Sequence, residues 1–438
     1  MVNRYESWGR FPRTNQHVIS HPWITDCFPA LPVLHSILPR GQGRSYGDSC
    51  LNDKNTLLST HRLDHFISFD REKGILECES GVTFESILKL IVPQGWFLPV
   101  TPGTKFITVG GAIANDVHGK NHHKAGNFCH HVESFELLRS NGDRLVCSQS
   151  ENQDCFYATI GGLGLTGLIL KAKFKLRPIA NPWISQEVIQ FEHVDEFMVL
   201  SEDSEQDYEY TVSWIDCLAK GKNLGRGLFI RGNHAPPQLE ASLPWVERKK
   251  RSVPFDFPSF TLNPVSVFLF NQAYYRKQRA RKISSLVHYD PFFYPLDAVH
   301  HWNRIYGKAG FLQYQFVVPF QKDHGAMIRR ILGEISKQGN ASFLTVMKVF
   351  GQVPSLGLLS FPKPGITVAL DFRVSDRSIF ALLDRLDRLV LDVGGVVYPA
   401  KDARMSAQSF QSFFPRLGEF RRWVDPRFSS SFWRRVNS

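Results

Sequence analysis

The chain has 438 residues, 43% of them hydrophobic and 21% charged, which excludes a disordered or fibrous protein and favours two globular domains. Its formal net charge is +11, a basic balance that attracts nucleic acid, anionic lipid or phosphorylated substrates without choosing among them. The seven cysteines are scattered and form no Cys-x-x-Cys pair, which disfavours a disulfide framework and a zinc ribbon and fits a reducing compartment.

The first stretch, residues 1–13, is interrupted by charged and aromatic side chains and lacks the apolar core of a secretory signal. No run approaches the roughly 18 apolar residues that a membrane-spanning helix needs. We therefore expect a chain made in soluble form in the cytoplasm.

Residues 1–178 form a first segment, rich in short strands and glycine-containing loops. The stretches 74–80 and 168–176 alternate between apolar and polar side chains, as strands do. Between them, Thr83 can cap a helix that carries its apolar side chains on one face and ends at Gly95.

Residues 179–393 form a second segment with longer elements, and a short third segment follows it. Their patterns predict strands at 313–318 and 365–372 and helices at 328–337 and 378–391.

The most specific passage is PRGQGRSYGD, residues 39–48, which follows an apolar stretch. Its three glycines free the backbone to adopt positive φ angles and to approach a ligand closely. Successive N–H groups in such a loop form a concave nest for a pyrophosphate, and the arginine, serine and tyrosine add donors. A structural turn explains two glycines, but it gives less reason for three around Arg-Ser-Tyr.

A second glycine-rich passage, PGTKFITVGGAIANDVHG, spans residues 102–119. In this interpretation Thr108, Gly110 and Gly111 bring the backbone close to a phosphate. Two anion-binding loops within one segment suit a dinucleotide with two phosphates, although this passage alone is only moderately specific.

A third passage, GLGLTG at residues 162–167, matches the pattern G-x-G-x-x-G. The nicotinamide-dinucleotide fingerprint requires a strand before this pattern and a helix after it, whereas an alternating strand follows here. The pyrophosphate would lack a helix N-terminus, so a flavin site or a tight structural turn explains these glycines better.

Five histidines lie close together, at positions 118, 122, 123, 130 and 131. His118 and His122 have metal-ligand spacing if they are helical, but nearby glycines favour a loop and no third ligand follows at a convincing spacing. We expect no metal site here, a flavin- or substrate-contacting role for His118, and surface positions for His130 and His131.

Gln313 and Gln315 flank a tyrosine in an expected strand, whose alternation places both amides on one face. Two such amides suit a polyhydroxylated substrate, and an exposed polar face explains them about as well. Lys348 and Lys401 each stand among apolar residues. Such a lysine is either a snorkelling surface residue or a buried cation that stabilises negative charge on a flavin or a substrate alkoxide.

Together, these passages resemble the flavin subunits of the decaprenylphosphoryl-β-D-ribose oxidases, within the vanillyl-alcohol-oxidase superfamily. The resemblance is carried by PRGQGRSYGD, PGTKFITVGGAIANDVHGKNHH, GGLGLTG, AGFLQYQFVVPF and YPAKDAR, which occur in the same order over nearly the whole chain. It implies a two-domain α+β fold. A PCMH-type FAD-binding domain, residues 1–178 completed by the tail 394–438, would hold an inserted substrate domain, 179–393, built on an antiparallel sheet.

The resemblance also implies FAD, held between the two domains. Many superfamily members attach the flavin to a histidine in the first glycine loop, and Arg44 stands where that histidine would be, so non-covalent FAD is expected. The matching cofactor-binding positions are Gly41, Gln42, Gly43, Arg44, Ser45, Tyr46, Gly47, Asp48, Gly103, Thr108, Val109, Gly110, Gly111, Asn115, Asp116, Val117, His118, Ile169 and Tyr398.

On the substrate side, the resemblance implies catalytic positions at Lys401, His118, Gln315 and Lys348, with Trp214, Arg304 and Gln313 near them. Three positions depart from the mycobacterial members. Thr367 and Ala369 replace an asparagine and a cysteine, and Phe293 replaces a tyrosine. The pocket would then accept a different sugar or lipid, and position 369 cannot be trapped by thiol-directed reagents.

The implied substrate is a polyprenyl-phosphate-linked pentose, whose C2 hydroxyl is oxidised to a ketone while hydride passes to the flavin. Lys401 would stabilise the forming alkoxide, and His118 would orient the ring or the substrate. A separate short-chain NAD(P)H-dependent reductase would complete an epimerisation to the arabinose form. An oxidase of a soluble sugar, alditol or aldonolactone on the same fold is the alternative.

Residues 254–282 gather apolar and aromatic side chains between two basic clusters, 248–251 and 276–282. Such a segment can enter a membrane interface while its cations meet anionic headgroups. We expect an enzyme at the inner face of the cytoplasmic membrane, and the sequence leaves the periplasmic face open. A mobile loop with a partly buried apolar patch explains it nearly as well. Nucleic acid is disfavoured as a partner, because no zinc finger, helix-turn-helix or RNA-recognition motif occurs.

Overall fold

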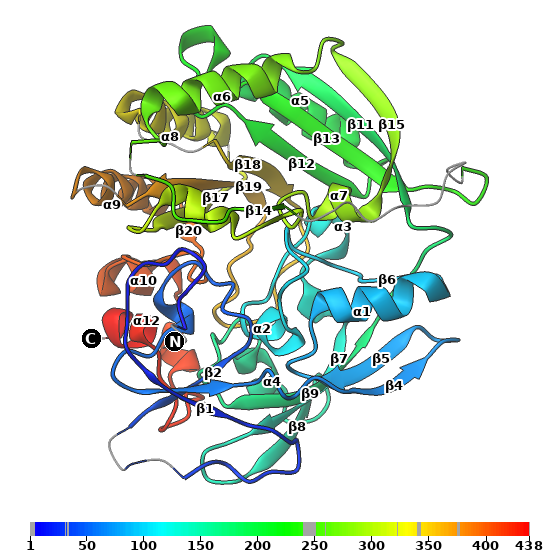
Figure 1. The fold of residues 1–438 in the computed structure, drawn as a ribbon, viewed down its shortest axis with the longest axis vertical. Helices are drawn as coiled ribbons and strands as arrows, with labels where there is room; N and C mark the ends of the chain where they lie inside the picture. The colour runs from blue at the N-terminus through cyan, green and yellow to red at the C-terminus, as the bar shows by residue number, and fades with distance from the viewer. Residues whose placement is uncertain are drawn as a thin grey trace.

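The computed structural model describes residues 5–30, 32, 35–239, 251–258, 260–321, 323–339, 343–374 and 377–437. Its elements form two halves, one above the other in Figure 1, with one large sheet in the upper half and two smaller main sheets in the lower half. Helices and mainly antiparallel sheets occur together in this arrangement, so the predicted α+β fold is confirmed.

Two sheets build the lower half. The three-stranded sheet has the parallel order β1-β3-β2, and the five-stranded sheet β4-β5-β9-β7-β8 is antiparallel. Helix α1 (Phe84–Ile91) packs its apolar face into the apolar core of the five-stranded sheet. Thr83 caps this helix by accepting a hydrogen bond from Ser86 N, as predicted. The strands are β1 (His17–Ser20), β2 (Ile37–Arg40), β3 (Thr56–Ser59), β4 (Phe66–Asp70), β5 (Ile75–Glu79), β7 (Val132–Leu138), β8 (Arg144–Ser148) and β9 (Leu168–Lys175).

The upper half contains one antiparallel sheet of order β15-β11-β13-β12-β18-β19-β17-β20. Its register pairs Gln313 with Asp371 and Lys348 with Thr367, so polar residues meet near its centre. The strands are β11 (Trp183–Phe191), β12 (Tyr210–Ile215), β13 (Gly227–His234), β15 (Lys282–His288), β17 (Phe311–Pro319), β18 (Thr345–Phe350), β19 (Gly365–Arg373) and β20 (Val396–Val397).

The helices predicted at 328–337 and 378–391 are present as α8 (His324–Gln338) and α9 (Arg377–Asp392), which share one apolar core with the large sheet. Among the described residues, no helix is both long and apolar enough to cross a bilayer. The shorter elements are β6 (Trp96–Phe97), α2 (Val109–Ala114), α3 (His122–Ala125), α4 (Gln153–Thr159), β10 (Arg177–Pro178), α5 (Val194–Ser204), β14 (Arg251–Ser252), α7 (Tyr289–Phe293), β16 (Val299–His300), α10 (Ala407–Phe413), α11 (Leu417–Phe420) and α12 (Ser431–Val436).

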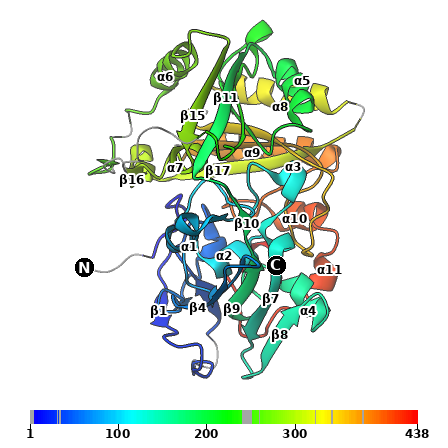
Figure 2. The ribbon, with the colours of Figure 1, turned by 90° about the vertical axis from the view of Figure 1, so that its right-hand side faces the viewer.

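The C-terminal tail crosses from the upper to the lower half. After β20 has paired with β17, the chain enters α10 and α11, which lie beside the lower half in Figure 2. Ile37 N of β2 donates to Arg427 O at 2.8 Å, and Arg435 of α12 pairs with Asp48 at 2.7 Å. The tail therefore packs on the first segment, while the exact domain boundaries stay a prediction.

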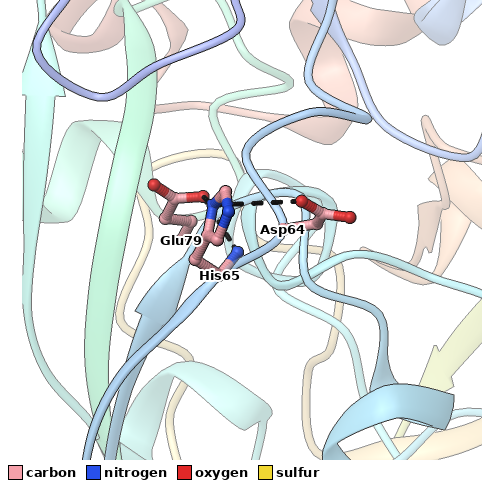
Figure 3. Close-up of side chains that lie close together, drawn as sticks. All are labelled: Asp64, His65 and Glu79. Atoms are coloured by element: carbon pink, nitrogen blue, oxygen red, sulfur yellow. Dashed lines mark hydrogen bonds and ion pairs between the residues drawn. The ribbon is translucent and has the colours of Figure 1, made fainter.

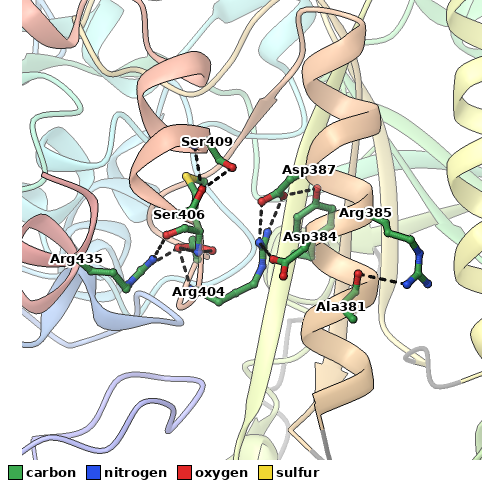
Figure 4. A network of polar contacts seen from close by, with 11 residues as sticks. Ala381, Asp384, Arg385, Asp387, Arg404, Ser406, Ser409 and Arg435 are labelled. Atoms are coloured by element: carbon green, nitrogen blue, oxygen red, sulfur yellow. Dashed lines mark hydrogen bonds and ion pairs between the residues drawn. The ribbon is translucent and has the colours of Figure 1, made fainter. Parts of the chain in front are cut away.

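The loop that carries Lys401 is tied down on two sides (Figure 4). On one side, Arg404 pairs with Asp387 of α9 at 2.6 Å, and both side chains are almost fully buried. On the other, Arg435 pairs with Asp402 at 2.9 Å. Because breaking a buried pair leaves an uncompensated charge, these contacts hold the loop in one geometry.

The segment 254–282 differs from the expected loop, because much of it is helical. Residues Pro264–Arg276 form α6, which Asn263 caps by accepting hydrogen bonds from the second and third amides, with a proline in the first turn. Of the first basic cluster, residues 248–250 lie outside the described residues, and Arg251 is exposed in β14. The helix lies on the outside of the upper half in both views (Figures 1 and 2).

Candidate active site

A cavity of about 890 Å³ lies between the two halves. Its walls come from the three glycine-containing passages, from strands β12, β17, β18 and β19, and from the loop that follows β20. All predicted site residues line this cavity except Gly47, Asp48, Val109, Asp116 and Arg304.

The first glycine loop presents unused donors to the cavity. Within the described part of the chain, the amides of residues 41–45 donate to no protein group, and Gly43 adopts a φ of 60° that favours glycine. Arg44 Nε is buried without a partner, and the guanidinium lies 4.2 Å from the ring centre of Trp8 and 5.2 Å from that of Phe106. Free amides beside a cation fit an anionic dinucleotide such as FAD.

The second glycine loop differs from the expectation. The amides of residues 109–111 already donate to Val82 O, Ser80 O and Thr108 Oγ1, at 3.0, 2.8 and 3.2 Å, because they start helix α2 against a neighbouring segment. They are therefore not free to hold a diphosphate, and Gly110 instead allows close packing on Ser80. The hydroxyl of Ser80 is buried at the cavity wall and has no partner among the described residues, so it offers a donor that the sequence did not reveal.

The passage GLGLTG leads directly into strand β9, as predicted. Leu163 and Gly164 adopt positive φ angles of 57° and 74°, and Leu163 N donates to Ala114 O at 2.8 Å. The passage is thus a tight turn that packs on α2 and forms one wall of the cavity, together with Ile169.

His118, Gln315 and Lys348 converge inside the cavity. Gln315 Nε2 lies 3.1 Å from His118 Nε2, and Lys348 Nζ lies 3.3 Å from His118 Nδ1. Burial and the charge of Lys348 lower the pKa of His118 well below its usual value, so the imidazole is neutral and has one donor and one acceptor nitrogen. With Gln315 donating to Nε2, the imidazole proton resides on Nδ1, the nitrogen that faces Lys348.

Lys401, Gln313 and Asp371 line the same cavity and form its polar centre together with His118, Gln315 and Lys348. Lys401 donates to Gln313 Oε1, and Gln313 Nε2 donates to Asp371 Oδ1 at 2.6 Å. Tyr306 donates its hydroxyl to Asp371 Oδ2 at 3.0 Å, and the Lys401 ammonium lies 4.1 Å from the ring centre of Tyr46. Asp371 is 1% exposed, so a buried carboxylate stands one amide away from Lys401.

The ionisable groups of this centre differ in charge near neutral pH. Burial lowers the pKa of Lys348 to about 7, helped by repulsion from Lys401 and Lys120. Burial lowers the pKa of Lys401 to about 8, while the attraction of Asp371 raises it. Burial raises the pKa of Asp371 to about 6, against hydrogen bonds and charge attraction that lower it. The centre therefore holds a cation, a carboxylate and an amine that releases its proton readily.

Five predicted residues face away from the cavity because other contacts use them. Gly47 packs against a backbone carbonyl of the C-terminal loop, and Asp48 is occupied by its ion pair with α12. Val109 and Asp116 are fully buried at the two ends of α2. Arg304 donates to two backbone carbonyls of residues 253–254, at 3.1 and 2.9 Å. The sequence alone did not show that contacts within the protein already occupy these five residues.

The remaining histidines do not join the centre. His130 and His131 are half-buried instead of lying on the surface, and their Nε2 atoms contact backbone carbonyls at 2.9 and 3.1 Å. Outside the cavity, Asp64, His65 and Glu79 lie close together (Figure 3). His65 Nδ1 lies 2.8 Å from Glu79 Oε2, and this hydrogen bond accounts for the grouping as a histidine–carboxylate pair.

Asp371 is the residue of the centre that the sequence did not reveal. It is in a strand that was predicted, and it shares a strand face with Thr367 and Ala369, two positions singled out for their departures from the family. The alternation of side chains along this strand could therefore have indicated that Asp371 faces the cavity. The partner across the sheet, Gln313, depends on strand register, which no local pattern specified.

Comparisons with known proteins agree with this geometry. A family model described as FAD binding domain matches residues 34–148, which include both the first and the second glycine loop. Decaprenylphosphoryl-β-D-ribose oxidase from Mycolicibacterium smegmatis is 37% identical over 418 residues, 91% of this chain and 89% of that protein. An uncharacterized protein in the mprA 5' region of Streptomyces coelicolor is 32% identical over 375 residues, 81% of this chain and 100% of that protein.

Human Delta(24)-sterol reductase is 33% identical over 125 residues, but this match covers 28% of the chain and 24% of that protein. The similarity to the mycobacterial oxidase, in contrast, extends over nearly all of both chains. Together with the FAD-binding match, it determines both the family and the cofactor. The chain belongs to the decaprenylphosphoryl-β-D-ribose oxidase family and is an FAD-dependent oxidoreductase that acts on CH–OH groups.

Proposed function

We propose that the substrate is a polyprenyl-phosphate-linked pentose, whose C2 hydroxyl is oxidised to a ketone in the first half of an epimerisation to the arabinose form. One observation carries this proposal: a centre of two amides and two lysines of different charge shares a single cavity with the cofactor loops. The name of the mycobacterial relative, an oxidase of a ribose attached to a phosphorylated lipid, supports the same substrate class.

The cavity fits FAD bound without a covalent link. Among the described residues, the amides of residues 41–45 and Nε of Arg44 have no partner and suit its negative charges. The resemblance also implies that Arg44 stands where other superfamily members carry the flavin-linking histidine. When bound, FAD supplies the acceptor for the hydride that leaves C2 of the pentose.

The side chains of the polar centre perform the other parts of the reaction. Gln313 and Gln315, on one face of β17, bind and orient the pentose hydroxyls. Protonated Lys401 stabilises the negative charge that develops on the C2 oxygen as the C–H bond breaks. Lys348, which releases its proton near pH 7, accepts the hydroxyl proton in its neutral form. Asp371 holds Gln313 in place and favours the charged form of Lys401.

We also propose that α6 docks on an anionic membrane surface. Its side chains Val265, Phe268 and Leu269 are 66%, 47% and 60% exposed, an apolar surface that a monomeric soluble protein rarely leaves uncovered. The exposed basic residues of 276–279 follow at the end of the helix. Each lysine or arginine near an anionic bilayer contributes about 1 kcal/mol, so the apolar face and the cations act together.

The product chemistry implies a second enzyme. A 2-keto pentose on a lipid becomes the arabinose form only by reduction at the same carbon from the other face. We propose that a short-chain NAD(P)H-dependent reductase supplies this step as a partner of the oxidase.

The test of the substrate uses the purified holoenzyme without oxygen. A synthetic polyprenyl-phosphoryl ribose should bleach the yellow flavin, and the variant Lys401→Met should keep its flavin but bleach far more slowly. If free sugars, alditols or aldonolactones bleach it as fast as the lipid, the protein is an oxidase of soluble sugars.

The test of the membrane proposal is flotation with anionic and neutral vesicles. Leu269→Asp should abolish flotation with the anionic vesicles. The matched control is Val199→Asp, on an equally exposed position of α5, which should float as the wild type does. Equal flotation of both variants would contradict the docking role of α6.

A further inference from the structure

The cavity has a second, apolar end that the chemistry of the polar centre does not use. This end is lined by side chains from β12, β13, β18 and α6 and from the residues that precede β18. A sugar ring and a phosphate have no need of such a wall, since pockets match the polarity of the ligand they enclose. Its lining consists of Val212, Trp214, Ile230, Phe270, Tyr274, Phe343, Leu344 and Val346.

The apolar end opens at the protein surface beside α6. Three of its lining residues, Phe270, Tyr274 and Val346, are 45%, 37% and 38% exposed, so they contact both the cavity and the outside. Phe270 and Tyr274 are one helical turn apart on α6, and their rings stack with centres 5.9 Å apart. They form the outer lip of the opening, next to the exposed apolar side chains of the same helix.

Aromatic rings lead without interruption from this opening to the polar centre. Trp214 packs on Tyr274 with ring centres 4.7 Å apart, and Phe343 lies 5.2 Å from Phe270. Phe343 in turn lies 6.0 Å from Tyr306, whose hydroxyl donates to the buried carboxylate of the centre. Trp214 Nε1 donates to Phe343 O at 2.9 Å, so its polar atom is satisfied and its ring is free to meet hydrocarbon.

We propose that these rings form a groove for the hydrocarbon tail of the lipid-linked substrate. The sugar enters the polar centre, the isoprene units nearest the phosphate lie against Trp214, Phe270 and Tyr274, and the rest of the tail leaves over α6 toward the membrane. The inference rests on the proposed function, since it assumes a polyprenyl substrate. It adds that the enzyme recognises the tail itself and not only the sugar.

The groove predicts a dependence of the reaction on tail length. In detergent solution, kcat/KM for flavin bleaching should be at least about tenfold higher for a three-isoprene substrate than for a single-isoprene one, because each added isoprene unit buries apolar surface. The variants Phe270→Ser and Tyr274→Ser should reduce this ratio to less than about threefold. Val199→Ser, at an exposed position of α5 that does not line the cavity, serves as the control and should retain the wild-type ratio.

The outcomes separate the groove from the proposed function. If the wild type oxidises both substrates with equal kcat/KM, or if the two α6 variants retain the wild-type ratio, the groove is refuted and the proposed function stands. If no polyprenyl-phosphoryl pentose of any tail length bleaches the flavin, the proposed function itself fails. Flavin content and thermal midpoints of the variants verify that they are folded.

Discussion

Replacing Asp371 by asparagine removes one buried charge and leaves the shape of the site intact. The asparagine can still bond Gln313 and Tyr306, which contact the two carboxylate oxygens at 2.6 and 3.0 Å. Asp371 is the group whose attraction raises the pKa of Lys401, which burial otherwise lowers to about 8. Its loss therefore lowers the pKa of Lys401 further. Since the proposed reaction needs the protonated amine of Lys401, the alkaline limb of the pH profile should move to lower pH.

The size of the shift follows from the separation of the charges. Lys401 and Asp371 are joined through the amide of Gln313, about 5 Å, where unit charges at an effective dielectric constant of ~20 interact by about 3 kcal/mol. This corresponds to about two pKa units, and solvent in the cavity reduces it to about 1.5. At about pH 7.5 the protonated fraction of Lys401 then falls from about 0.76 to about 0.09, an eightfold loss of rate, whereas at about pH 6 the rates differ by only about 1.3-fold.

The assay is anaerobic stopped-flow bleaching of the flavin by a polyprenyl-phosphoryl ribose across this pH range. Tyr306→Phe keeps the carboxylate but removes a hydrogen bond that lowers the pKa of Asp371, so its alkaline limb should move in the same direction as that of Asp371→Asn and by less. The reasoning is refuted if Asp371→Asn is slowed by the same factor at both pH values, because Asp371 would then act through structure alone.

Three further predictions follow from the site and its supports. Acid precipitation should release all yellow colour into solution, because the resemblance places Arg44 where other superfamily members carry the flavin-linking histidine; colour that stays with the pellet would reveal a covalent bond. Lys348→Met should lose the acid limb near pH 7 and slow bleaching by about a hundredfold, since it removes the proposed base; an acid limb that persists would identify another base. Arg435→Ala should lower the unfolding free energy of the holoenzyme by about 3 kcal/mol in urea, because two buried carboxylates lose their partner. Arg416→Ala breaks an exposed pair and should lower the unfolding free energy by less than about 1 kcal/mol. An equal decrease for both variants would mean that the buried pairs stabilise the fold no more than the exposed pair does.

Much of the fold could be predicted because its signals are local. Thr83 caps its helix with its own hydroxyl, and the apolar periodicity of 328–337 and 378–391 specifies helices wherever they pack. The turn at GLGLTG needs positive φ angles at Gly164 and Gly167, which glycine permits at any place in a fold. Such features depend on neighbours within a few residues, so the sequence by itself determined them, along with the residue types that line the cavity.

The tertiary structure decided which of these groups remain available. Within the described ranges, the amides of residues 41–45 donate to no protein group while those of 109–111 are occupied, although both loops have the same glycine-rich character. Strand register brought Asp371 to Gln313 and so to Lys401, and the position of α6 in the fold placed Phe270 and Tyr274 in the wall of the cavity. A donor or a charge is free or satisfied only with respect to partners distant in the chain, and packing alone brings those partners together.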